Sequence, residues 1–260
     1  MNIFIEILVC FLAGAGAGLG TGFAGMSAAA VITPMLVTFL NVPVYSAVGI
    51  ALASDVLASA VSAYTYKRDG NLDVRNGLIM MVSVLLFTAV GSFVSSLVPV
   101  SAMGSFSVIM TALLGIKFIV KPVMTTKEAM QSVSPSKRAI QSIVSGCMIG
   151  FICGFIGAGG GMMMLLVLTS ILGYELKTAV GTSVFIMTFT ALTGAISHFV
   201  IDGSPDWWIL ALCVIFTLIW ARIGARIANK SSAKTLNRIT GVILLSLGII
   251  ITAVNFIKGI

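Results

Sequence analysis

The fold is decided by two glycine-rich stretches, GAGAGLGTGFAGMS at residues 14–27 and GCMIGFICGFIGAGGG at residues 146–161. Each lies inside an apolar run, 3–40 or 139–173, that is too long for one membrane-spanning helix of about 20 residues. Five glycines of the first half recur 132 residues later in the second half: Gly14, Gly18, Gly22, Gly25 and Gly49 match Gly146, Gly150, Gly154, Gly157 and Gly181. We interpret the chain as an internal duplication in which each half begins with a glycine-broken segment.

The rest of the chain is strongly apolar. Hydrophobic residues make up 58% of the 260 residues, charged residues only 9%, and the mean hydropathy is +1.14. A soluble domain carries about 25% charged residues. The composition therefore excludes a soluble enzyme, a nucleic-acid binder and a disordered protein, and it predicts an all-α polytopic membrane protein with the lipid bilayer as its solvent.

The remaining apolar runs have the length of single helices. They are 44–66, 76–98, 101–120, 177–200, 207–228 and 236–257. With the two broken segments, we predict about eight spans and up to ten helical segments. The predicted domains are a first transmembrane repeat at 1–120, a basic linker at 121–138 and a second transmembrane repeat at 139–260.

The basic residues predict the orientation in a cell membrane. Of the 15 Lys and Arg, 13 lie in or beside the loop 67–75, the linker 121–138 and the stretch 222–238, all of which we expect to be cytoplasmic. The acidic loop near 202–206 should lie outside, followed by interfacial Trp207 and Trp208. The basic segments share one side only if run 139–173 folds back as a hairpin. Three further crossings per half then insert the second repeat upside down relative to the first.

The glycine breaks form the candidate binding site. The apolar parts that follow them, 28–40 and 162–173, span roughly 18–20 Å as helices, which is too short for a core of about 30 Å. Helix N-termini carry unsatisfied N–H donors and partial positive charge, so two of them meeting inside the membrane would bind a small anion. The predicted substrate-binding residues here are Gly20, Thr21, Gly22, Gly25, Met26, Ser27, Gly157, Ala158, Gly159, Gly160 and Gly161. For the glycines spaced by four, the alternative is close helix packing.

Asp55 is the only acidic residue deep within an apolar run. A carboxylate in hydrocarbon is costly, so this group is either a proton-coupling site or a structural hydrogen-bonding group. Its equivalent in the second half is Met187, so any role is asymmetric. The hydroxyls of Ser54, Thr182 and Ser183 on the equivalent helices join the predicted substrate-binding residues, although such groups more often bond to their own helix.

Other chemistry-bearing residues give weaker signals. His198, the only histidine, is interpreted as an interfacial residue, with proton handling as the alternative. The basic positions 222, 226, 230, 234 and 238 have four-residue spacing and would also draw anions to a cytoplasmic mouth. The four cysteines lie in apolar runs without metal-ligand spacing, and no nucleotide-binding motif occurs. We therefore predict no cofactor and no metal.

These patterns resemble the TauE/SafE family of sulfite and organosulfur anion exporters. The resemblance rests on the opening Gly18–Thr33 followed by Pro34, on Ala47–Gly49, and on the copies at Gly150–Gly161 and Ala179–Gly181. It covers nearly the whole chain. One departure is Leu166, which stands in the second copy where Pro34 stands in the first. The resemblance implies an integral membrane transporter for sulfite, sulfoacetate or a related sulfonate or carboxylate, and it leaves the direction open because the family contains importers too.

We therefore predict a secondary transporter, not an enzyme, that exports a small anion by proton-coupled alternating access. The alternatives are an importer, a passive channel for small anions, and an intramembrane serine hydrolase that uses Ser27 and His198. The hydrolase is the weakest of these alternatives, because a single Ser-His pair at unrelated depths in the membrane is weak evidence for a catalytic site. Whether the protein forms a homodimer is left open.

Overall fold

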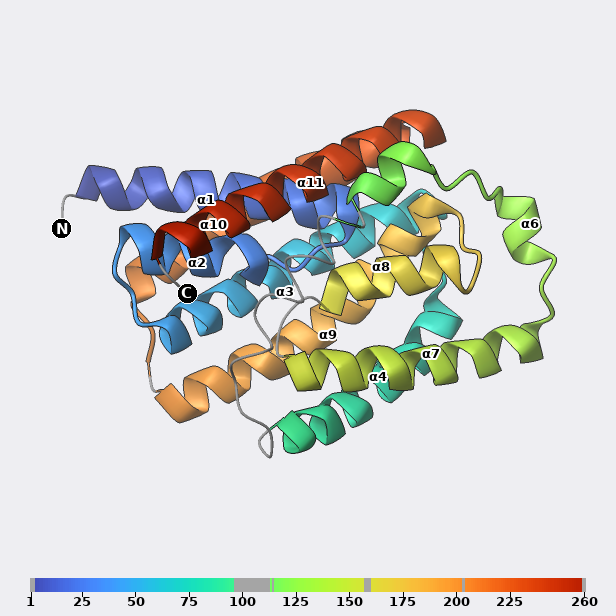
Figure 1. Cartoon of the computed structure of the whole chain (residues 1–260), viewed down its shortest axis with the longest axis horizontal. Helices are drawn as coiled ribbons and strands as arrows, with labels where there is room; N and C mark the ends of the chain where they lie inside the picture. The colour runs from blue at the N-terminus through green and yellow to red at the C-terminus, as the bar shows by residue number, and fades with distance from the viewer. Residues whose placement is uncertain (1–2, 96–112, 114, 157–159, 203, 259–260) are drawn as a thin grey trace.

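The computed structural model describes residues 3–95, 113, 115–156, 160–202 and 204–258. The first half contains α1 (Ile3–Ala24), α2 (Ala29–Phe39), α3 (Val44–Arg68) and α4 (Val74–Ser95). The second half contains α7 (Pro135–Ile156), α8 (Gly160–Ser170), α9 (Leu176–Asp202), α10 (Trp207–Lys230) and α11 (Ala233–Lys258). The short α6 (Lys127–Gln131) lies in the linker (Figure 1). The described residues contain no strand, which confirms the all-α class.

The helices follow the predicted apolar runs, including the two breaks, except that most of the run 101–120 lies outside the described residues. Within the described residues, five segments are long and apolar enough to cross a membrane: α1, α3, residues Val74–Gly91 of α4, Leu176–Val200 of α9, and α10. The run 3–40 is divided between α1 and α2, and the run 139–173 between α7 and α8. Helices α2 and α8 have 11 residues each. At 1.5 Å per residue they are roughly 16 Å long, so neither can cross an apolar core of about 30 Å.

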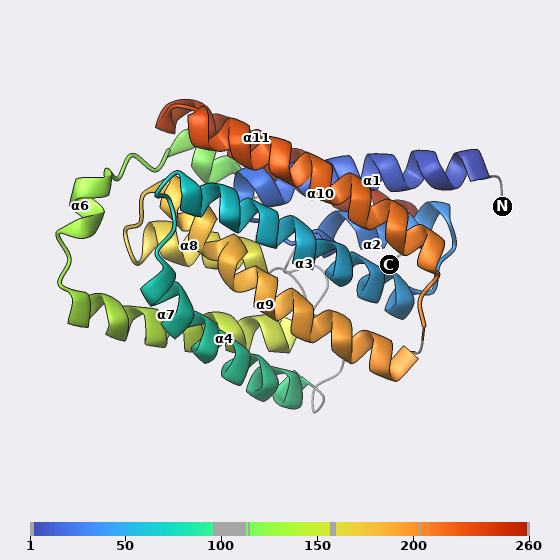
Figure 2. The ribbon, with the colours of Figure 1, turned by 180° about the vertical axis from the view of Figure 1, so that it is seen from behind.

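The second half runs in the opposite direction to the first. In Figure 1, α1 runs from left to right and its equivalent α7 from right to left, and α3 and α9 are likewise opposed; Figure 2 shows the same from behind. This is the arrangement that inverted repeats have. The loop 69–73, the linker 121–134 and the turn 231–232 consequently lie at one end of the molecule, on the right in Figure 1, which we call the basic end.

The two repeats are interlocked through equivalent helix pairs. Helix α1 packs on α10 and α7 packs on α4, while α3 packs against α9. Glycine permits both outer contacts, because a Cβ on Gly14 or Gly18 would overlap α10 and one on Gly146 or Gly150 would overlap α4. These glycines therefore serve close helix packing.

The ends of the two short helices show the duplication in atomic detail. Asn41 after α2 and Gly173 after α8, 132 residues apart, have φ of 53° and 65°. The Val42 N–H donates to the Leu36 carbonyl at 3.3 Å, and the equivalent Tyr174 N–H donates to the Leu168 carbonyl at 2.8 Å. Both helices thus end in the same left-handed turn.

The basic stretch 222–238 is not one stripe. Arg222, Arg226 and Lys230 belong to α10, whereas Lys234 and Arg238 belong to α11. The turn at 231–232 separates the two groups, because Ser231 ends α10 through hydrogen bonds from its N–H to Ile227 and Ala228. The four-residue spacing therefore places only the first three residues on one helix face.

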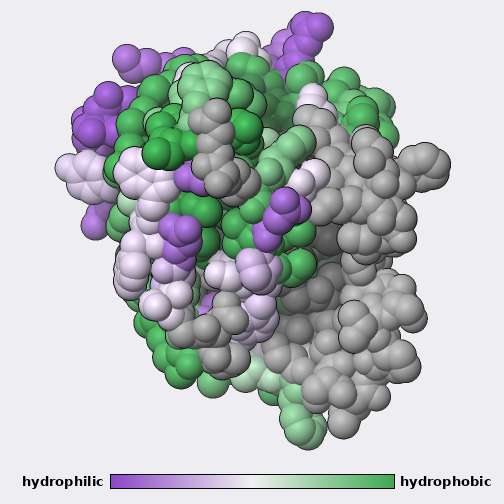
Figure 3. Space-filling view, turned by 90° about the vertical axis from the view of Figure 1, so that its left-hand side faces the viewer, coloured by the Kyte–Doolittle hydropathy of each residue, from purple (hydrophilic) through white to green (hydrophobic). Residues whose placement is uncertain are grey.

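The described surface is largely apolar. Figure 3, which looks onto the end opposite the basic end, shows hydrophobic residues over much of it and hydrophilic ones in small separate patches. Exposed side chains include Phe4, Leu86, Val90, Val200 and Ile215. Apolar area of this extent is unfavourable in water and is expected of a protein that lipid surrounds.

Candidate functional site

The break between α1 and α2 is a tight loop that closes on itself. Gly25 has φ of 59°, a left-handed conformation that favours glycine. Its N–H donates to the Thr21 carbonyl at 3.0 Å, and the Met26 N–H donates to the Gly20 carbonyl at 3.3 Å. The Thr21 hydroxyl donates to the Met26 carbonyl at 2.8 Å. The side chain of Thr21 thus holds the shape of the loop.

The second break lies directly against the first. Gly161 is in the first turn of α8, and a Cβ there would lie 3.2 Å from the Ser27 backbone nitrogen and would overlap the Gly25 carbonyl oxygen. A Cβ on Gly25 would in turn overlap the Ser183 hydroxyl of α9. Elements of both repeats therefore converge on one point. Gly160 begins α8, whereas Gly157, Ala158 and Gly159 lie outside the described residues.

Asp55 on α3 is hydrogen-bonded to the α1–α2 break. The carboxyl is 1% exposed, and it accepts hydrogen bonds from the Ser27 hydroxyl at 2.7 Å and the Ser59 hydroxyl at 2.9 Å. The Ala28 backbone N–H lies close to it as well. In the part of the chain that the structure describes, Asp55 has no ion-pair partner. The protein's own carboxylate thus sits where the N-terminus of α2 would hold an anion.

The other predicted residues are used differently. Gly22 packs against Ala221 and Ala225 of α10, where a Cβ would be 2.7 Å from their backbone atoms. Thr182 accepts a hydrogen bond from the Asp73 N–H at 3.2 Å, which ties α9 to the loop after α3 at the basic end. Neither residue is part of the contact between the breaks.

The remaining hydroxyls mostly bond to their own helix. Ser54 donates to the Ile50 carbonyl and Ser183 to the Val180 carbonyl, each at 2.9 Å. This is the common behaviour of helix serines. Of the two, Ser183 also contacts Gly25 at the break, so it stays beside the candidate site.

The Ser-His pair of the hydrolase hypothesis does not form. Ser27 donates to Asp55. The Nδ1 of His198 lies 3.1 Å from the Tyr45 carbonyl oxygen, and the two rings stack with centroids 4.1 Å apart. His198 therefore contacts the start of α3, at the end of the fold opposite the basic end (Figure 1).

A polar network at the basic end was not anticipated. The Asn71 amide donates to Asn229 on α10 at 2.7 Å, and Lys127 of α6 donates to Asn71 at 2.8 Å. Lys177 of α9 donates to the Asn229 carbonyl at 2.8 Å. Both asparagines are largely buried; Asn229 directly follows the apolar run 207–228, whereas the sequence around Asn71 gives no such signal. The network joins the two repeats and the linker at this end.

Tyr174 closes the same end from the second repeat. Its hydroxyl donates to Asp73 at 2.8 Å, and the Arg138 guanidinium lies 4.6 Å from its ring centroid. Burial raises the pKa of Tyr174 above its ordinary value, so the phenol stays protonated and remains a donor. Arg138 also donates to the Met130 carbonyl, which anchors the linker to α7.

Comparison with known proteins identifies the family. The family model for sulfite exporter TauE/SafE matches residues 10–251. The Bacillus subtilis protein YdhB, named a probable membrane transporter protein, is 26% identical over 250 residues, which are 92% of this chain and 98% of YdhB. YunE of the same organism, which carries the same description, is 24% identical over 95% of this chain and 96% of its own. MJ0441 of Methanocaldococcus jannaschii, described in the same way, is 25% identical over 89% of this chain and 87% of its own.

No solved structure matches the chain significantly. Because the match spans most of the chain, this protein is a membrane transporter that belongs to the sulfite exporter TauE/SafE family.

Proposed function

We propose that the protein is a secondary transporter that exports a small anion, such as sulfite, sulfoacetate or a related sulfonate or carboxylate, by alternating access. The observation that carries this proposal is the contact between the α1–α2 break and the first turn of α8 at Gly161. Two helices too short to span the membrane begin there, one from each inverted repeat. Their N-termini supply N–H donors and partial positive charge without a buried cation.

The same proposal places the protein in the cell membrane with the basic end in the cytoplasm. Thirteen of the 15 Lys and Arg lie in or beside the three segments at that end. Cytoplasmic loops carry such an excess of positive residues. The end with Asp206 and Trp207 then faces outside.

The position of Asp55 supports proton coupling as part of this proposal. Its carboxylate accepts a hydrogen bond from the Ser27 hydroxyl and lies close to the Ala28 N–H, and both groups are at the start of α2. Two negative charges a few ångströms apart in a low dielectric repel strongly, so an anion cannot enter beside an ionised Asp55. A proton on Asp55 removes the charge and releases the α2 donors to the substrate. The anion and the proton therefore bind together.

This coupling also favours a second candidate, an importer. Moving one monovalent anion with one proton transfers no net charge, so the direction depends on the two concentration gradients alone. Export proceeds when the anion is more concentrated inside. A more acidic exterior drives the same cycle inward, so the proton coupling that we propose at Asp55 is the feature that favours import under such a gradient.

Flux into liposomes tests the function. The purified protein is reconstituted, and uptake of sulfite, sulfoacetate, acetate and chloride is measured with and without a pH gradient. The proposal predicts saturable flux that prefers a sulfur-containing or carboxylate anion and responds to the gradient. Linear flux in which chloride passes as fast as sulfite would indicate a passive channel instead.

A further inference from the structure

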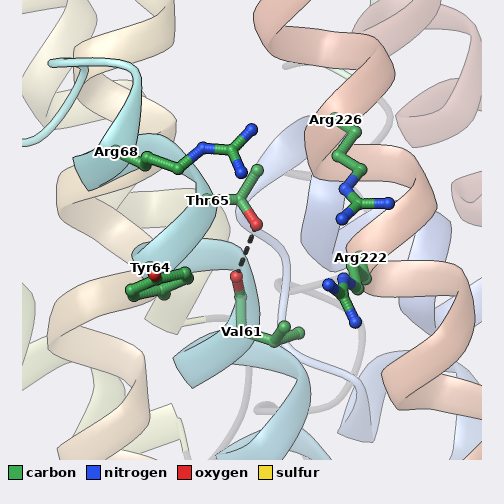
Figure 4. A pocket seen from close by; sticks show the side chains of 6 residues that line it. All are labelled: Val61, Tyr64, Thr65, Arg68, Arg222 and Arg226. Atoms are coloured by element: carbon green, nitrogen blue, oxygen red, sulfur yellow. Dashed lines mark hydrogen bonds between the residues drawn. The ribbon is translucent and has the colours of Figure 1, made fainter.

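A second site of different chemistry lies between α3 and α10, near the basic end. It is a pocket of about 230 Å³. Its lining consists of Val61, Tyr64, Thr65 and Arg68 from α3 and Arg222 and Arg226 from α10 (Figure 4). The two helices pack side by side (Figure 2). Arg68 follows Asp55 by 13 residues on the same helix, or roughly 20 Å along its axis, so the pocket is separate from the glycine breaks.

The pocket has three positive groups and no acid in its lining. Arg222 and Arg226 lie one turn apart on α10, and Arg68 approaches from α3 (Figure 4). Among the described residues, one ion pair involves these arginines. It joins Arg68 Nε to Asp69 Oδ1 at 3.7 Å, and the side chains of Arg68 and Asp69 are 62% and 35% exposed. The Thr65 hydroxyl donates to the Val61 carbonyl at 2.8 Å. Like charges at this spacing repel, so the arrangement gains stability when an anion binds between the guanidinium groups.

The pocket lies near the ends of two candidate membrane-spanning helices, where lipid headgroups are expected. Arg68 is the last residue of α3, and Arg226 lies in the last two turns of α10. Tyr64, on the rim, is 68% exposed, as an interfacial aromatic residue is. Exposed apolar side chains continue along both helices toward the middle of the membrane; they are Leu57, Ile215 and Ile219. A ligand with a negative head and hydrocarbon tails fits both parts of this surface.

We propose that the pocket binds the phosphate group of an anionic phospholipid, whose acyl chains lie along the exposed faces of α3 and α10. Arginine presents a planar fork of donors that matches phosphate oxygens bidentately. Basic pockets between transmembrane helices hold anionic headgroups in this way. Inorganic phosphate offers the same oxygens, but it gains nothing from the apolar faces beside the pocket.

Native mass spectrometry of the detergent-purified protein tests this site. The protein is titrated with phosphatidylglycerol, and separately with phosphatidylcholine and with inorganic phosphate. Wild type should bind phosphatidylglycerol in preference to both. The double variant R222Q/R226Q should bind it about 30-fold more weakly, since each arginine near the membrane surface contributes about fivefold. The matched control K230Q/K234Q removes the same charge from the same end outside the pocket, and it should keep the wild-type affinity.

A second pair of substitutions keeps the test decisive if the glutamine variant does not fold. R222K/R226K retains both charges but loses the planar fork, and it should bind phosphatidylglycerol more weakly than wild type. Unchanged affinity in this variant, or an equal loss in K230Q/K234Q, would overturn the site. Displacement of the lipid by inorganic phosphate at the same concentration would show that the pocket takes a free anion and would overturn the lipid assignment.

Discussion

Replacing Asp55 with Asn tests the proposed coupling most sharply. The change removes the negative charge beside the start of α2 and keeps the size of the side chain. The Ser27 hydroxyl can still donate to the amide oxygen. The amide nitrogen, however, then faces the Ser59 hydroxyl, which donates to the carboxylate. One unpaired donor costs about 1–3 kcal/mol of stability, so the amount of inserted protein is measured alongside flux.

The expected accumulation of the anion follows from the proposed stoichiometry, in which one carboxyl carries one proton per anion. A pH difference of one unit corresponds to about 1.4 kcal/mol, or a tenfold accumulation of a monovalent anion on the alkaline side. Wild-type liposomes with a more acidic exterior should concentrate isotope-labelled substrate about tenfold. Liposomes with D55N should only equilibrate it, because no proton is carried.

The matched control is Ser59→Ala, which removes one hydrogen bond to the carboxyl and leaves the charge in place. It should retain the tenfold accumulation of wild type. Its free energy of unfolding should fall by about 1 kcal/mol. Full accumulation by D55N would refute the coupling mechanism, since the proton would then be carried by another group.

Three further predictions concern the packing of the repeats. Gly161→Val should abolish flux in the liposome assay while the protein still inserts, because the new side chain overlaps the Gly25 carbonyl. The control Gly16→Ala should transport normally in the same assay, because a Cβ there meets only Val31 at 3.3 Å. Tyr174→Phe should lower the melting temperature in detergent by about 2–4 °C, because Asp73 loses one hydrogen-bond donor while the ring beside Arg138 stays. An unchanged melting temperature would show that the Tyr174–Asp73 hydrogen bond does not stabilise the fold. Mild oxidation of wild type should link Cys10 of α1 to Cys213 of α10, since the register that places Gly14 on Thr217 puts these buried thiols side by side; a peptide map without that link, or one unchanged by Cys213→Ser, would contradict this register.

The sequence predicted the repeats and their breaks because glycine acts locally. A glycine spaced by four marks a close helix contact, and a cluster of glycines ends a helix wherever it occurs. The match of Gly14 and Gly18 to Gly146 and Gly150 therefore fixed which helices are equivalent before any contact was known. The charge distribution then required a hairpin, and the structure contains the expected short helices α2 and α8.

The parts that sequence could not predict depend on which helices pack together. Asn71 and Asn229 meet only because α10 lies on α3, and the same packing brings Arg68 to Arg222 and Arg226. No local pattern joins residues so far apart in the chain. Thr182 shows the same dependence. Its position on the helix equivalent to α3 predicted a binding residue, and the packing adds a contact that the sequence did not indicate, in which its hydroxyl accepts from the Asp73 N–H of the incoming loop.

The position of the bound anion tests most directly whether the two glycine breaks form the binding site. Selenite, the selenium analogue of sulfite, can be located by anomalous diffraction in crystals of the protein. We expect a selenium peak between the start of α2 at Ser27 and the start of α8 at Gly161, within hydrogen-bonding distance of their backbone N–H groups. A protein that transports selenite yet shows its peak only elsewhere, for example among Arg68, Arg222 and Arg226, would contradict this expectation.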